Sequence, residues 1–145
     1  MKIKLLIISL LVSVFLVDKK NDFYKPIQQD GKLKESIQRG KEVYMDMCLR
    51  CHLANGKGVP KVYPPLAKSD YLLEKREESI RAIKYGLRGK IVVNGKPYRS
   101  IMTKPGLDDD EVADVMNYIT NSWGNTYDKM VTEKEVAAVP KKKKS

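Results

Sequence analysis

The pentapeptide Cys48-Leu49-Arg50-Cys51-His52 contains both cysteines and the only histidine of this 145-residue chain. On a helix, residues three and four positions apart lie on one face, so the two thiols and the imidazole would project together. A zinc site needs a fourth strong ligand, and the chain has no further Cys or His to supply it. The chain must therefore fold so that one short segment places three reactive side chains at a single site.

This spacing favours covalent attachment of a haem. Two thiols three residues apart add to the two vinyl groups, and the histidine that follows them binds the iron. We therefore expect Cys48 and Cys51 to form thioethers to one haem c and His52 to be an axial iron ligand. Three alternatives stay open: a redox dithiol, which normally needs a βαβ setting that is missing here, a strained disulfide, and a chance match.

The second axial ligand is sought among the six methionines, because His and Cys are used up. Five are less suitable, since they lie in the terminal segments, on the helix that carries Cys48, or on the apolar stripe of the last helix: Met1, Met130, Met45, Met47 and Met116. Met102 lies in an irregular segment that could wrap to the far face of a haem. We expect Met102 to be the ligand, with an open or lysine-ligated site as the alternative.

The N-terminal residues 1–17 are typical of a targeting segment. Lys2 and Lys4 precede the uncharged, mostly aliphatic run from Leu5 to Val17. This run suits the core of a signal peptide and is short for a spanning helix, but no small-residue cleavage site follows it. We expect either a signal peptide or an N-terminal membrane anchor. The rest of the chain would be exported to the periplasm, soluble or anchored to the outer face of the cytoplasmic membrane.

The remaining chain is expected to be all-α with long loops. Residues 18–35 are polar and predict a linker, and residues 36–124 predict the folded domain. A helix should begin at the N-cap Ser36, and apolar periodicity predicts further helices over about 69–75, 77–85 and 107–123. Glycine and proline mark 53–68 and 88–106 as loops. Residues 125–145 predict a polar, basic tail ending in Lys141–Lys144.

The formal net charge of +10 points to an anionic partner. It falls to +8 if Lys2 and Lys4 are removed with the targeting segment. We expect acidic redox proteins as partners and a monomeric chain, with membrane association possible through residues 1–17. Nucleic acid is not expected, because the lysine run at 141–144 is most simply a solvated tail.

The ordered set of motifs in residues 36–124 resembles the class I c-type cytochromes. The set runs from Arg39–Tyr44 and the attachment motif through Asn55–Gly58 and Tyr63–Leu66 to Met102 and the last helix. The resemblance implies a class I cytochrome c fold, with about four to five helices and long loops around one covalently attached haem. It also implies that the carbonyl of Pro64 accepts a hydrogen bond from His52, and that Gly40 lies at a helix crossing beside Tyr118.

The resemblance implies a monohaem electron carrier of a respiratory chain rather than an enzyme. A His/Met ligand pair would raise the potential relative to two histidines. The alternative is a haem c subunit of a larger membrane oxidase, reductase or dehydrogenase complex, which the additional terminal segments allow. A haem-based sensor or a peroxidase would need an open sixth site.

Overall fold

The computed structural model describes residues 25–127 and 129–141. The expected targeting segment 1–17 and residues 18–24 of the expected linker lie outside the described residues. The chain divides into one unit up to Lys32 and a second from Leu33 onward. Within the described ranges, no helix is long and apolar enough to cross a membrane.

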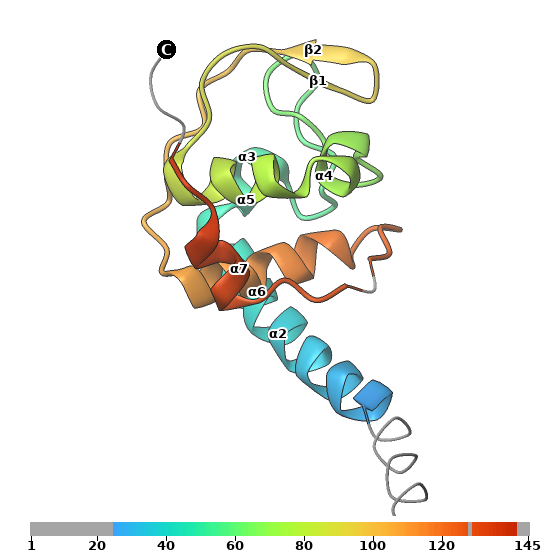
Figure 1. Cartoon of the computed structure of the whole chain (residues 1–145). Helices are drawn as coiled ribbons and strands as arrows, with labels where there is room; N and C mark the ends of the chain where they lie inside the picture. The colour runs from blue at the N-terminus through green and yellow to red at the C-terminus, as the bar shows by residue number, and fades with distance from the viewer. Residues whose placement is uncertain (1–24, 128, 142–145) are drawn as a thin grey trace, which may run out of the picture. The chain divides into compact units, whose positions relative to one another are not determined.

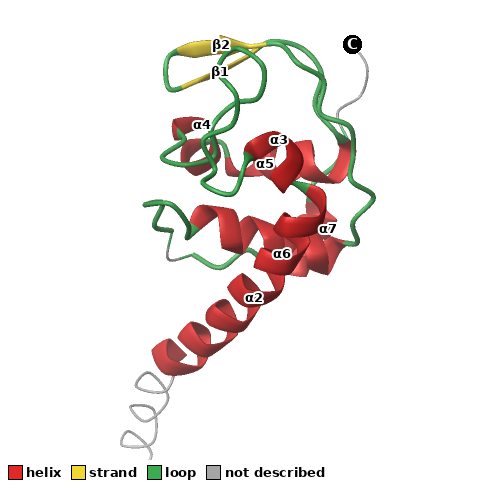
Figure 2. Ribbon diagram, turned by 180° about the vertical axis from the view of Figure 1, so that it is seen from behind, coloured by secondary structure: helices red, strands yellow, loops and turns green. Residues whose placement is uncertain are grey.

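The described part is mostly helical, as expected, with one small hairpin (Figures 1 and 2). The helices and strands are, in chain order, α2 (Lys25–Met47), α3 (Leu49–His52), α4 (Asp70–Glu74), α5 (Arg76–Tyr85), β1 (Ile91–Val93), β2 (Lys96–Tyr98), α6 (Asp109–Thr120) and α7 (Glu133–Ala138). Two helix starts follow the sequence closely. The side chain of Ser69 caps α4, and Asp108 and Glu111 form a capping box at α6.

The first helix differs from the prediction, because α2 begins at Lys25 and not at Ser36. The residues before Ser36 are mostly good helix formers, so the helix continues through the segment predicted to be a linker. Ser36 is not an N-cap. It is fully buried, and its hydroxyl donates to a carboxylate oxygen of Asp114 on α6 at 2.6 Å.

Helices α2 and α6 approach each other closely at Gly40. A Cβ atom at this position would lie 1.9 Å from the carbonyl oxygen of Asp114, so only glycine fits. One turn later, Tyr44 packs against Tyr118 and Trp123, with ring centroids 5.3 Å and 5.0 Å away. The expected helix crossing at Gly40 is therefore present, and the expected aromatic residue Tyr118 packs there against Tyr44, so that the end of α2 is fixed against α6.

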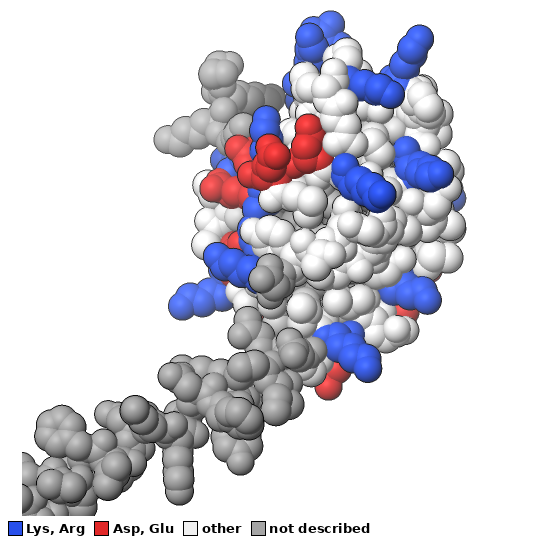
Figure 3. Space-filling view, turned by 90° about the vertical axis from the view of Figure 1, so that its right-hand side faces the viewer, with Lys and Arg blue, Asp and Glu red and all other residues white. Residues whose placement is uncertain are grey.

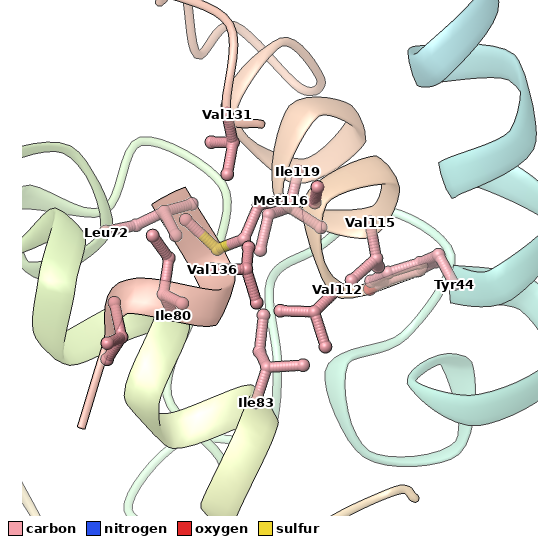
Figure 4. Close-up of a cluster of buried hydrophobic side chains, with 12 residues drawn as sticks. Tyr44, Leu72, Ile80, Ile83, Val112, Val115, Met116, Ile119, Val131 and Val136 are labelled. Carbon is pink, nitrogen blue, oxygen red and sulfur yellow. The ribbon is translucent and has the colours of Figure 1, made fainter. Parts of the chain in front are cut away.

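The C-terminal segment also differs from the prediction. Residues 129–141, called here the C-terminal arm, do not form a solvated tail, because Val131, Val136 and Val139 are buried in the main core. Figure 4 shows Val136 among Met116, Ile80 and Ile83. Three valines spread through a polar stretch give too weak a period to predict burial.

The segment 88–106 was predicted to be a loop, but it contains the antiparallel hairpin of β1 and β2. The turn residues Asn94 and Gly95 have φ values of 50° and 73°, as a type I′ turn requires. The two stretches that flank the hairpin run side by side, as both ribbon views show, and pair through Leu87 and Met102 (Figures 1 and 2).

The helix crossing gives a first testable prediction. Gly40→Ala should lower the free energy of unfolding of the holoprotein by about 3 kcal/mol or more, because the new methyl group meets backbone that cannot move without separating α2 from α6. Gly31→Ala on the same helix is the control. A Cβ there meets nothing within 4 Å, so it should be neutral or stabilising by up to about 1 kcal/mol. Denaturant titration measures both, and equal effects would contradict the close approach.

Candidate functional site

The attachment motif sits where α2 ends and α3 begins. The amide of Cys48 donates to the carbonyl of Tyr44 at 2.9 Å, and the amide of His52 donates to that of Cys48 at 3.0 Å. This helical turn brings Cys48, Cys51 and His52 to the wall of one cavity of about 290 Å³. Both cysteines are free thiols. Burial, and secondarily the neighbouring Cys51, raises the pKa of Cys48 to about 11.

The imidazole of His52 is held in one orientation. The residue is buried, and its Nδ1 lies 3.1 Å from the carbonyl oxygen of Pro64, the contact that the resemblance implies. Burial lowers the pKa of His52, while the hydrogen bond to Pro64 acts in the opposite direction. The neutral ring therefore carries its proton on Nδ1, where it donates to Pro64, and Nε2 keeps the lone pair that a metal requires.

Met102 lines the same cavity from a different part of the chain. Its amide and carbonyl pair with those of Leu87 at 3.0 Å and 2.8 Å. Gly86, which ends α5, has a φ of 80°, and a Cβ there would lie 2.8 Å from the carbonyl oxygen of Met102. The end of α5 thus holds the backbone of Met102 through two hydrogen bonds and a close approach that favours glycine.

The other methionines are placed less favourably. Met116 is fully buried in the core, as expected, and Met45 is exposed on α2. Met47 does line the cavity, but it is 55% exposed and directly precedes Cys48 at the end of α2. Met102 is the cavity methionine that comes from a segment remote in sequence from the attachment motif.

The cavity wall is mainly apolar. Sequence reasoning missed several lining residues. Ile91, Tyr98 and Ile101 lie in the segment 88–106, which it treated as an irregular loop, and Leu87 directly precedes that segment. The Asn94-Gly95 pair directly after the apolar run Ile91–Val93 was the available indication of a hairpin. A second cavity of about 70 Å³ shares Cys48, His52 and Met102 and is lined by core residues.

These features fit a haem better than a bare metal ion. Within residues 25–127 and 129–141, no three His, Cys, Asp or Glu side chains gather as a metal would require. An imidazole nitrogen, a thioether sulfur and two free thiols instead face one apolar space. Borderline and soft ligands of this kind suit haem iron, and the thiols suit attachment of the porphyrin.

Comparison with known proteins agrees with this chemistry. The sequence profile of the family described as Cytochrome c matches residues 37–123. The chain is 37% identical over 100 residues to a cytochrome c-552 of Thermus thermophilus, a match that covers 66% of this chain and 67% of the relative.

Cytochrome c subunits of larger enzymes are also similar. Identity is 31% over 108 residues to that of a quinone-dependent alcohol dehydrogenase from Gluconobacter oxydans, and 34% over 111 residues to that of a gluconate 2-dehydrogenase from Pantoea cypripedii. These matches cover 68% and 74% of this chain but only 22% and 25% of the two relatives. The chain belongs to the cytochrome c family, and it is an electron carrier with covalently bound haem c.

Proposed function

We propose that Cys48 and Cys51 hold the haem through two thioethers, and that His52 and Met102 are the axial ligands of its iron. The single observation that carries this assignment is the cavity that brings the four side chains together. His52 and Met102 reach it from segments held by separate backbone contacts, through Pro64 and Leu87. Because each segment is positioned by its own backbone contact, the two side chains are suited to be two ligands of one metal.

The haem supplies a one-electron couple between ferric and ferrous iron. The chain sets the conditions for that couple. The hydrogen bond to Pro64 keeps the lone pair of His52 directed away from the backbone, and the thioether of Met102 favours the ferrous state. The apolar wall excludes water and so disfavours the more highly charged ferric state. Together these features support a fairly high reduction potential.

The proposal places this carrier outside the cytoplasm, in the periplasm or at the outer face of the membrane, as a monomer between respiratory redox partners. The targeting character of residues 1–17 supports export, although those residues lie outside the described structure. They would also provide the membrane association, if they remain attached.

Acidic proteins are the proposed partners. The segments that line the cavity carry exposed cations: Arg50, Arg88, Lys90, Arg99 and Lys104. Met47 and Ile101, both at the cavity, are each 55% exposed and would offer an apolar centre of contact. Basic side chains are also spread over the face in Figure 3, where most acidic ones gather in a single group.

A second candidate is a haem c subunit of a dehydrogenase or another membrane redox complex. The similarity to two dehydrogenase cytochrome subunits favours it. Co-purification of the native protein with a membrane complex would support this role, whereas recovery as a free monomer would support the shuttle.

Attachment is tested by removing the thiols. Cys48→Ala/Cys51→Ala should release its haem into acidified acetone, because no thioether remains. Each single variant should retain one bond. Haem staining after denaturing electrophoresis measures the result, and staining that survives in the double variant would contradict the assignment.

The sixth ligand is tested at Met102. Met102→Ala should let carbon monoxide bind the ferrous protein, and Met102→His should stay six-coordinate with a potential lower by about 0.1 V or more, because axial ligands set haem potentials over roughly 0.8 V. Both should lose the weak far-red absorption of a sulfur–iron bond. Met45→Ala, on the exposed face of α2, is the control. Loss of the band in Met116→Ala but not in Met102→Ala would refute this ligand.

Electrostatic docking is tested with small redox reagents of opposite charge. Oxidation by anionic ferricyanide should slow as ionic strength rises, because the Debye length falls to about 8 Å at 0.15 M. Oxidation by a cationic cobalt complex should quicken. Arg88→Glu, beside the cavity-lining Leu87, should weaken the ferricyanide effect more than Lys134→Glu on α7. Rates that do not depend on salt would remove the steering argument.

A further inference from the structure

We infer that the C-terminal arm is a positioning element for Met102, acting through Arg81 and Tyr85 of α5. This inference rests on the proposed role of Met102 as an iron ligand. It assigns to residues 129–141 a part in setting the haem site, although none of them is among the residues that line the haem cavity.

The arm is fastened along the length of α5. Near the start of the helix, Arg76 forms a bidentate ion pair with Glu135, at 2.6 Å and 2.7 Å, and also donates to the carbonyls of Lys129 and Met130. The ion pair lowers the pKa of Glu135. Val136 of the arm is fully buried and lies near Ile80 and Ile83 of α5 (Figure 4). The arm is therefore docked by both charge and apolar burial.

The fastening continues to the last turn of α5. Arg81 donates to the carbonyl of Pro140 at 3.0 Å, Lys84 to that of Val136 at 3.0 Å, and Tyr85 to that of Val139 at 3.1 Å. Positions 81, 84 and 85 are three and four residues apart, so they share one face of the helix. The arm thus holds the final turn of α5 from one side.

The same final turn leads directly to the Met102 backbone. Gly86 and Leu87 follow Tyr85 without a spacer, and Leu87 exchanges two hydrogen bonds with Met102. Lys141, the last residue of the arm, lines a groove together with Gly86, Leu87 and Met102. Any shift of the last turn of α5 therefore changes where the backbone of Met102 lies.

Displacement of a weak thioether ligand requires the Met102 segment to move away, which is a local opening. The arm opposes that opening because it holds the element to which the segment is paired. Loosening the arm should make the sixth ligand more labile, even in a protein that remains folded and keeps its haem.

The test compares two variants of the full-length holoprotein. Arg81→Met/Tyr85→Phe removes two donors to the arm and leaves every residue that lines the haem cavity unchanged, Met102 and Leu87 included. It also removes the ion pair of Arg81 with Glu77 within α5. Arg39→Met is the matched control, because it breaks an ion pair of 2.6 Å with Asp114 that joins α2 to α6 and not α5 to the arm. Truncation of the arm is less useful, since it would also remove three buried valines from the core.

Three readouts follow the opening. In the double variant, the amides of Leu87 and Met102 should exchange with deuterium, and imidazole should bind the ferric protein, about fivefold to tenfold faster, the factor expected from losing one or two hydrogen bonds. The far-red sulfur–iron band should weaken. In Arg39→Met, the free energy of unfolding should fall while all three readouts stay near wild type.

The outcomes separate this inference from the proposal on which it rests. If the double variant loses stability but matches Arg39→Met in exchange, imidazole binding and absorption, the arm is only a stabilising element and the inference is overturned. If Met102→Ala retains the far-red band, the assignment of Met102 itself fails, whatever the arm variants show.

Discussion

The close approach of α2 and α6 at Gly40 is the contact on which the placement of the site depends. The two helix backbones lie so close at Gly40 that no Cβ atom fits between them. One turn later, the aromatic side chains of Tyr44, Tyr118 and Trp123 pack against one another and hold the two helices together. Tyr44 also donates from its hydroxyl to the carbonyl of Leu53 at 2.7 Å, just beyond the attachment motif. The motif is thus held at both ends by the same helix crossing.

The cavity is part of the core and not a cleft added to it. Ile83, Val115 and Ile119 belong to the buried cluster and also line the smaller cavity beside His52. The group that fills this space therefore replaces apolar side chains that a domain of this size would otherwise need. An unfilled cavity in an apolar core costs stability in proportion to its volume. Filling this space should therefore stabilise the fold.

The sequence was informative where local chemistry decides the outcome. The attachment motif, the serine cap at Ser69 and the acidic start of α6 could all be recognised from a few adjacent residues. Placement of Met102 at the cavity followed from eliminating other methionines. The contacts that hold it could not be foreseen, because Leu87 and Gly86 meet it only through tertiary pairing. Sequence reasoning missed the start of α2 and the burial of Val131, Val136 and Val139, because neither segment has a strong periodicity of apolar residues.

Helix α5 and the C-terminal arm contribute different kinds of groups to the hydrogen bonds that join them. The helix supplies side-chain donors from Arg81, Lys84 and Tyr85, whereas the acceptors in the arm are main-chain carbonyls. A carbonyl is present whatever the residue, so these bonds place no demand on side-chain identity at 136, 139 or 140. Burial of the valines, the charge of Glu135 and the side-chain cap that Thr132 supplies to α7 restrict the sequence of the arm. These hydrogen bonds therefore constrain side chains on α5 and leave the side chains of their partners in the arm unconstrained.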